Sequence, residues 1–140
     1  MEAWATEFIT VWEKNRVQFA QAGLDAIQGN PLLPVKEYSL SDSLQFLDGT
    51  TAMMREVLTG SGTDVRDMYF NSVIPGIIAQ GQPVSGFVAQ VTLVAVVFAS
   101  SLLPQIRKKH RDQAAKFLAE FYMEFNYQIV KIGMEMGAKS

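Results

Sequence analysis

Residues 68–106, MYFNSVIPGIIAQGQPVSGFVAQVTLVAVVFASSLLPQI, contain no Asp, Glu, Lys or Arg, and this uncharged stretch decides the fold. Residues 84–103 match the length of about 20 residues that a membrane span needs, and the basic run 107–111 follows them. Five polar side chains interrupt this window: Ser85, Gln90, Thr92, Ser100 and Ser101. A single span would also leave the amphipathic segments on either side without partners for their apolar faces. We therefore predict a protein core, with a small membrane-associated helical protein as the alternative.

Residues 84–103 are predicted to form one central helix. Their many valines also suit a strand, but about twenty residues without a turn signal exceed the usual strand length. Pro83 fits the first helical turn, where a missing N–H costs nothing, and Pro104 is expected to end the helix. Because this helix is apolar nearly all round, we expect other helices to enclose most of its sides.

The segments before this helix show the apolar spacing of amphipathic helices. Residues 3–27 are predicted to form one helix, with Trp4, Phe8, Val11, Trp12, Asn15, Phe19 and Ala22 on its inner face. A second helix is predicted over residues 40–58, with Ser39 or Ser41 as its N-cap and Gly60 at its end. A third is predicted to begin at Thr63 or Asp64 and run to Gln80.

Proline and length shape the third helix and the last one. Pro75 is expected to kink the third helix, because proline cannot donate the backbone hydrogen bond. The buried side of that helix is predicted to comprise Val65, Met68, Tyr69, Ser72 and Val73. The last helix is predicted to follow Asp112 as its N-cap and to run for about 26 residues, or about 39 Å. Its inner stripe comprises Leu118, Tyr122, Phe125, Ile129, Ile132 and Met136. At that length we expect it to project from the globule.

These elements predict one all-α, globin-like domain over residues 1–140, with five to six helices and a long C-terminal helix. A chain of 140 residues has the common size of a single domain. The unequal connections and the kinked middle favour globin-like packing at steep crossing angles over a parallel-sided four-helix bundle.

The composition excludes several classes of function. A net charge of -2 does not favour nucleic acid as a partner. The absence of cysteine excludes disulfide scaffolds, thiolate zinc sites, iron–sulfur clusters and cysteine nucleophiles. The first twenty residues lack the continuous apolar segment of a secretory signal. We therefore expect a cytoplasmic protein.

No catalytic, cofactor-binding or metal-binding residue is expected. The only histidine, His110, lies within the basic run 107–111 and is predicted to be solvated. A haem would need an inward axial ligand, and neither of the helices predicted over residues 64–80 and 84–103 contains His or Cys. Glu120 and Glu124 are four residues apart but lack the histidine partners of di-iron bundles. The sequence therefore predicts a protein that is not an enzyme.

Two candidate binding surfaces remain. Neutral polar groups and aromatic rings predict a mostly apolar ligand pocket lined by Asn71, Gln80, Phe87, Gln90 and Phe98. The alternative is that these polar groups hydrogen-bond the backbone and one another. The first and last helices also contain more aromatic residues than one small core readily buries. They predict a homodimer interface that comprises Trp4, Phe8, Trp12, Phe117 and Phe121.

Three segments occur in a familiar order: WATEFITVWEKNRVQFAQ (4–21), YFNSVIPGIIAQGQPVSGFVAQVTLVAVVF (69–98) and AAKFLAEFYMEFNYQIVKIGMEM (114–136). With the corner at residues 79–81, this order resembles the N-terminal non-haem globin domain of RsbR-type stressosome proteins, an anti-sigma factor antagonist family. The resemblance implies a haem-free globin fold that forms a homodimer and passes a signal down its last helix to a C-terminal STAS domain. Related haem-free sensors bind fatty acids, so a fatty acid is a candidate ligand.

The expected function is therefore that of a stress-response sensor domain. On the resemblance, the chain is either a module of a longer protein with a STAS domain or a stand-alone relative. It would control an alternative sigma factor or a similar pathway, with stressosome STAS-domain proteins as partners. A haem or oxygen-binding globin is one alternative, and the membrane-associated protein is the other. Neither nucleic acid nor a membrane is predicted as a partner.

Overall fold

The computed structural model describes residues 1–33 and 38–138, and they form an all-α fold. The α-helices are α1 (Ala3–Lys14), α2 (Arg16–Gln28), α3 (Leu40–Thr59), α4 (Asp64–Met68), α5 (Ile74–Ala79), α6 (Val84–Leu102) and α7 (Arg111–Glu135). A π-helical turn, Tyr69–Val73, joins α4 to α5, and the 3-10 turns Leu103–Gln105 and Lys108–His110 lie between α6 and α7. No strand occurs in these described residues. If α4, the π turn and α5 are counted as one bent helix, the described residues form six helices, within the predicted five to six.

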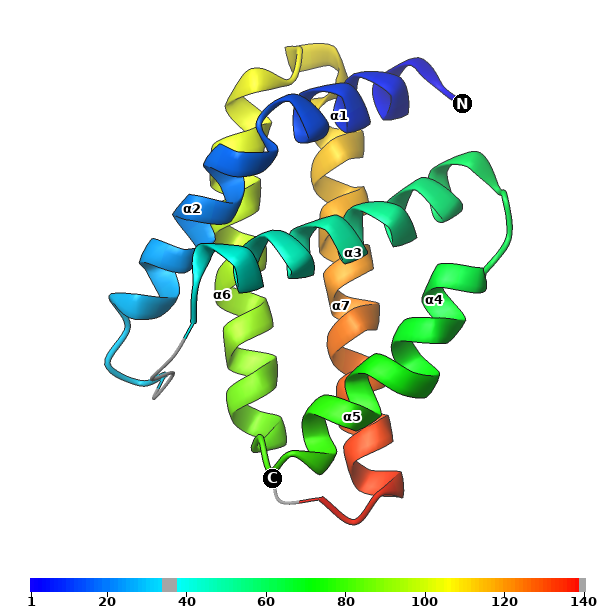
Figure 1. The fold of residues 1–140 in the computed structure, drawn as a ribbon. Helices are drawn as coiled ribbons and strands as arrows, with labels where there is room; N and C mark the ends of the chain where they lie inside the picture. The colour runs from blue at the N-terminus through cyan, green and yellow to red at the C-terminus, as the bar shows by residue number, and fades with distance from the viewer. Residues whose placement is uncertain (34–37, 139–140) are drawn as a thin grey trace.

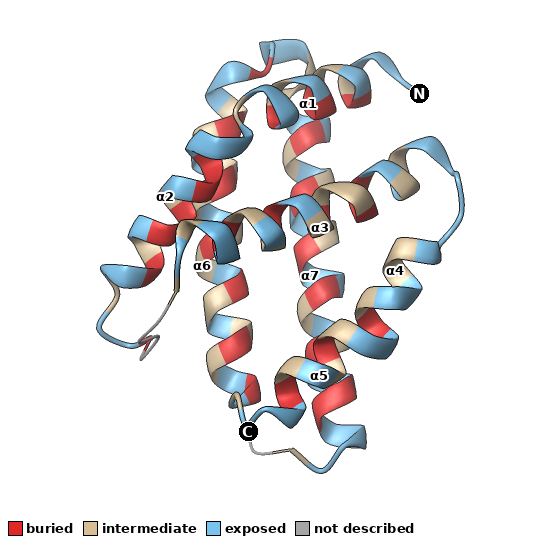
Figure 2. Ribbon diagram, viewed as in Figure 1, coloured by how far each residue is buried: buried red, intermediate tan, exposed pale blue. Residues whose placement is uncertain are grey.

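An antiparallel pair, α6 and α7, forms the centre of the molecule (Figure 1). Helix α3 crosses this pair at a steep angle, α1 lies over one end, and α2 runs beside α6. The bent helix formed by α4, the π turn and α5 covers α7 on the side away from α2. The buried positions of every long helix face this centre (Figure 2). They join into one hydrophobic core.

The single helix predicted over residues 3–27 is wrong, because the chain bends at Asn15. The Asn15 side chain donates to the carbonyl of Val11 at 2.8 Å and to Gln105 Oε1 at 3.1 Å. A side-chain amide that bonds nearby backbone competes with the helical ladder. The bend allows α1 to lie across the end of α7 while α2 packs along α6.

Helix α3 begins and ends where the sequence predicts. Of the two candidate caps, Ser39 forms a capping box in which its side chain accepts from Asp42 N and the Asp42 carboxylate accepts from Ser39 N. Gly60 ends the helix in the left-handed conformation with φ 64°, which glycine adopts without steric cost.

The third predicted helix contains a π turn ahead of Pro75 rather than a simple kink. The N–H of Ile74 bonds the carbonyl of Tyr69, five residues back. The extra residue in this turn rotates the side chains that follow, so the predicted buried side is partly wrong. Ser72 and Met68 are exposed, whereas the buried side chains on this segment are Phe70, Ile74 and Ile78.

The prediction that the central helix is enclosed on most sides is wrong. Helix α6 packs against α2 and α7, but its outer face is open and Val96 is 58% exposed. Residues Val84–Gln105 are long and apolar enough to cross a membrane by length and composition, with a mean hydropathy of 2.1 and 28% of the window buried. Pro83 is the N-cap of α6 rather than part of its first turn.

The last helix does not project from the globule. Over its 25 residues α7 buries side chains from Ala114 to Ile132, because α6, α1 and α5 flank its whole length. It begins one residue before Asp112, so Asp112 lies in the first turn and is not the N-cap. Met136, predicted on the inner stripe, is 44% exposed beyond the end of the helix.

Candidate functional site

A groove of about 730 Å³ lies between α3, the π turn with α5, and the start of α6. Its apolar walls include Leu33, Phe46, Val73, Ile74, Ile77 and Phe87. Its polar groups include Tyr38, Gln45, Tyr69, Gln80, Gln82 and Gln90. A concave volume of this size, mostly apolar with a few convergent polar groups, is typical of small-molecule sites.

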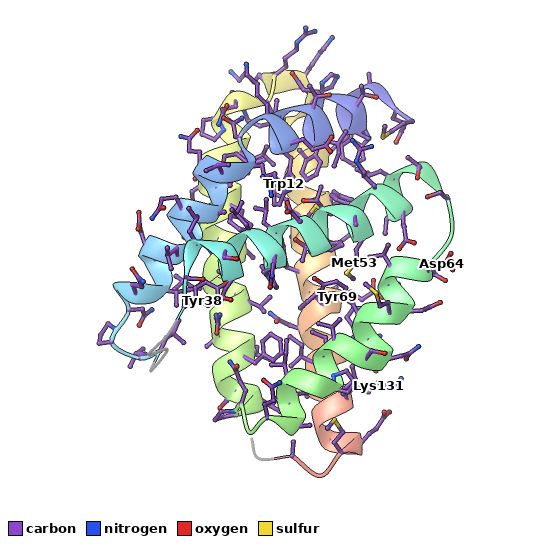
Figure 3. The ribbon with its side chains drawn as sticks, viewed as in Figure 1. Trp12, Tyr38, Met53, Asp64, Tyr69 and Lys131 are labelled. Atoms are coloured by element: carbon purple, nitrogen blue, oxygen red, sulfur yellow. The ribbon has the colours of Figure 1, made fainter. Side chains whose placement is uncertain are left out.

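Tyr69 reaches the groove because of two local features. It is the first residue of the π turn, a feature that is frequent at functional sites. Its ring packs on α3 at Gly49, where a Cβ atom would lie 1.6 Å from Tyr69 Oη. Only glycine therefore fits under this ring. Figure 3 shows Tyr38 and Tyr69 on the same side of α3, Tyr38 toward α6 and Tyr69 toward α7.

Tyr38 lies at the other side of the groove, just before the N-cap of α3. Its backbone carbonyl accepts a hydrogen bond of 3.2 Å from Gln28 Nε2, which ties it to the end of α2. Burial raises the pKa of the Tyr38 hydroxyl, against weaker opposing hydrogen bonds from Ser43 and Gln90. Burial also raises the pKa of Tyr69, and the negative charge of Asp48 adds to that shift. Both phenols are therefore neutral at physiological pH.

The polar end of the groove is formed by the corner between α5 and α6. Gly81 turns the chain there with φ 95°. The corner brings Gln82 Nε2 to 3.4 Å from Gln90 Oε1, a long and weak hydrogen bond. Asp42 is the charged side chain among the described groove residues, and its carboxylate accepts hydrogen bonds of 2.9 Å from Ser39 N and Oγ.

The structure brings together three of the five residues predicted to line a pocket. Gln80, Phe87 and Gln90 line the groove. Asn71 does not, because the π turn leaves it on the exposed outer side. Phe98 does not either, because it lies about three turns beyond Phe87 and is fully buried among aromatic rings of α1 and α2.

Sequence reasoning missed the groove residues that come from outside the uncharged stretch. Tyr38 and Phe46 belong to segments far from residues 68–106, and only the tertiary fold brings them there. The sequence held one usable signal for Phe46, because a large aromatic residue beside the apolar stripe of α3 needs a packing partner of its own. Tyr69 was assigned to the core instead.

The five aromatic residues predicted as a dimer interface pack on one another within the chain. Phe8 and Trp12 are fully buried, so they cannot contact a second copy. Trp4, Phe117 and Phe121 are half-buried. The ring centroids of Phe117 lie 5.2 Å from Phe8 and 5.8 Å from Trp4, in an aromatic contact between α1 and α7. This cluster joins α1 to α7 within the chain.

His110 is not the solvated loop residue that the basic run predicts. Its side chain is largely buried, and Nδ1 lies 2.8 Å from Glu7 Oε1 on α1. The same carboxylate accepts a hydrogen bond of 3.1 Å from Arg107 N. The contact with the His110 ring lowers the pKa of Glu7 despite an opposing contribution from burial. The cluster therefore joins α1 to the segment between α6 and α7, and its residues are not among those that line the groove.

Within residues 1–33 and 38–138, no group of three or more His, Asp or Glu side chains has the arrangement of a metal site. No protein-family model, curated protein or solved structure matches the chain. The groove between α3, α5 and α6 is the candidate site.

Proposed function

We propose that the chain is a haem-free, non-enzymatic sensor domain that binds a small, largely apolar molecule in the groove and passes its ligand state to α7. One observation carries this proposal. Phe46 and Tyr69 line the groove and also pack against Phe125 of α7, with centroid separations of 5.8 Å and 6.5 Å. The ligand site and the last helix therefore share side chains.

Phe125 is well placed to respond to changes in the groove. It is 1% exposed and also contacts Phe70 of the π turn at 5.7 Å. Protein interiors are close-packed, so a ligand that shifts Phe46 or Tyr69 on binding displaces Phe125 as well. A helix that takes up two packing arrangements transmits such a change over its length. This route agrees with the signal path that the resemblance to RsbR-type domains implies.

The same proposal includes the cellular role that the resemblance suggests. The domain would act in the cytoplasm, and its partners would be STAS-domain proteins of a stressosome that controls an alternative sigma factor or a similar pathway. The groove supports the sensing step alone, and the partner is proposed from the resemblance.

A homodimer is also part of the proposal, with a different surface from the predicted one. Helix α7 carries exposed apolar side chains at Met123, Tyr127, Val130 and Met134. Their spacing of four, three and four residues places them along one face, as in helices that pack against another helix. Twofold dimers are the commonest homo-oligomers, and their interface is formed by the same face of both copies. Helix α6 packs beside α7, and its own exposed face carries the apolar residue Val96.

The ligand site is tested with a substitution that fills the groove. Gly86 lies on the groove wall, and a Cβ there meets nothing within 4 Å. Gly86→Leu should fill this space and weaken binding of the neutral fluorescent probe N-phenyl-1-naphthylamine by at least about tenfold, while the helix gains stability from losing a glycine. Gly76→Leu is the matched control, because Gly76 is helical and equally open but outside the groove. Equal probe binding by both variants would contradict the site.

The transmission step is tested by hydrogen exchange of the α7 amides around Phe125 with and without the probe. Binding should change their exchange in the wild type, and Phe125→Leu should weaken that response more than it weakens binding. A ligand that alters exchange only in α3 and α5 would show that α7 does not receive the signal.

The dimer and the haem alternative have their own tests. Tyr127→Glu should convert a dimer into a monomer in sedimentation at tens of micromolar protein, a range where weak dimers form, whereas Gln113→Glu should not. A wild-type monomer under those conditions would count against the dimer. Titration with haemin should give no Soret band; a band would favour the haem-binding globin instead.

A further inference from the structure

The electrostatics of the groove discriminate between ligands of the same shape. Among its described lining residues the charged side chain is an acid, Asp42, and none is a Lys, Arg or His. Among these described residues, an anionic head group would find no cationic partner to offset its lost hydration.

The remaining polar groups suit an uncharged head. The Gln82 and Gln90 carboxamides each offer a donor and an acceptor, and they meet in a weak contact of 3.4 Å. A ligand group that both donates and accepts can replace that contact at little cost. Tyr38, which lies just before the N-cap of α3, lines the same groove. Together these side chains match an alcohol or a primary amide.

The rest of the groove suits an apolar body. Phe46, Ile77 and Phe87 come from three different elements and face one volume of about 730 Å³. Apolar surface removed from water there stabilises a complex, before the costs of association. A chain of methylene groups gains from such walls whatever its head group is. The head group therefore decides the selectivity.

We propose that the groove binds an uncharged amphiphile, with its apolar body against Phe46, Ile77 and Phe87 and an alcohol or amide head between Gln82, Gln90 and Tyr38. It selects this molecule over the fatty acid of equal chain length. This inference rests on the proposed function, since it requires the groove to be a ligand site. It replaces the fatty acid that the resemblance suggests as a candidate.

The test compares dodecanol, dodecanamide and dodecanoate as competitors of N-phenyl-1-naphthylamine on the full 140-residue protein near neutral pH. All three contain twelve carbons, and dodecanamide and dodecanoate share the same undecyl chain, so a difference between these two reports the head group. The alcohol and the amide should displace the probe at concentrations at least about tenfold lower than dodecanoate, because the carboxylate is desolvated beside Asp42.

A charge substitution provides the decisive variant. Gln82→Lys places a cation at the polar end of the groove and should bring dodecanoate to the affinity of the alcohol or beyond it. Gln113→Lys adds the same charge on an exposed position of α7 outside the groove, and it should leave the order of the three ligands unchanged.

The outcomes separate this inference from the proposed function. If dodecanoate binds the wild type as tightly as the alcohol and the amide, the head-group selectivity is wrong while the groove remains a ligand site. If the probe and all three competitors fail to bind, the proposed function fails with it. A preference for the alcohol that both lysine variants leave intact would show that charge does not set the selectivity.

Discussion

Phe87 and Phe98 lie about three turns apart on the inner face of α6, and their surroundings differ. Phe98 is fully buried, with ring centroids 5.3 Å from Trp12 and 6.4 Å from Phe19. The polar atom of that cluster, Trp12 Nε1, donates to Thr51 Oγ1 at 2.7 Å. Phe87 instead faces the groove and its glutamines. The end of α6 that carries Phe98 is therefore closed, and the polar atom of its cluster is hydrogen-bonded. The end that carries Phe87 is open, and its glutamines form only a weak hydrogen bond with each other.

This difference separates stability from binding. At the closed end, rings of α1, α2 and α6 fill the space, so a ligand would have to displace them. At the open end the walls come from α3, α5 and α6 without filling the volume between them. Loss of packing should therefore be costly at the first end and tolerated at the second.

The largest expected effect is at the closed end. Phe98→Ala removes a fully buried ring and should lower the free energy of unfolding by about 3–5 kcal/mol. Ile77→Ala, on the half-buried groove wall, should cost roughly 1 kcal/mol because part of its surface is already in contact with water. Urea unfolding followed by circular dichroism measures both. Equal losses would remove the distinction between the two ends.

A pair of glycines sharpens the comparison. Gly49→Ala places a Cβ 1.6 Å from Tyr69 Oη, so Tyr69 must leave its position; about 1–3 kcal/mol of stability and the probe affinity should be lost together. Gly23→Ala places a Cβ 3.3 Å from Phe98 Cε1, a contact that a small shift relieves. The second variant should retain probe binding. Full probe affinity in Gly49→Ala would show that Tyr69 is not needed in the groove.

The N-cap of α3, beside the groove, carries a smaller effect. Ser39→Ala removes a capping box and should cost about 1 kcal/mol. Ser41→Ala, two residues into the same helix, should be neutral or slightly stabilising, because alanine is the better helix former. Thermal unfolding of the two variants distinguishes them. A larger loss for Ser41→Ala would mean that the helix begins later than the structure places it.

The sequence predicted what short-range signals determine. Ser39 and Gly60 bound α3, and the uncharged stretch holds the central helix, because caps and periodicity act within a few residues. The bend at Asn15 was missed; besides its local bond to the Val11 carbonyl, the Asn15 amide bonds Gln105, 90 residues away. Likewise, no local sequence signal distinguishes Phe98, which is fully buried, from Phe87, which lines the groove.

The candidate site was predictable only in part for the same reason. Gln80, Phe87 and Gln90 lie within one continuous stretch, where a common apolar surrounding suggests a shared pocket. Tyr69 depends on its fit against Gly49, and Phe46 on the crossing of α3 over the α6–α7 pair. Such contacts follow from helix packing, which no local pattern in these residues encodes.

An effect of similar size concerns the contact of Glu7 with His110, which joins α1 to the chain between α6 and α7. The pKa of Glu7 is lower in the folded protein than its ordinary value of 4.5, chiefly through the hydrogen bond with His110. The contact therefore stabilises the fold above that ordinary value, and this contribution is lost as the pH falls through the lowered pKa. Glu7→Gln should cost about 0.5–1.5 kcal/mol near neutral pH and should flatten the acid limb of the stability curve. Urea unfolding at a series of pH values measures both, and an acid limb identical to that of the wild type would show that the contact of Glu7 with His110 does not stabilise the fold.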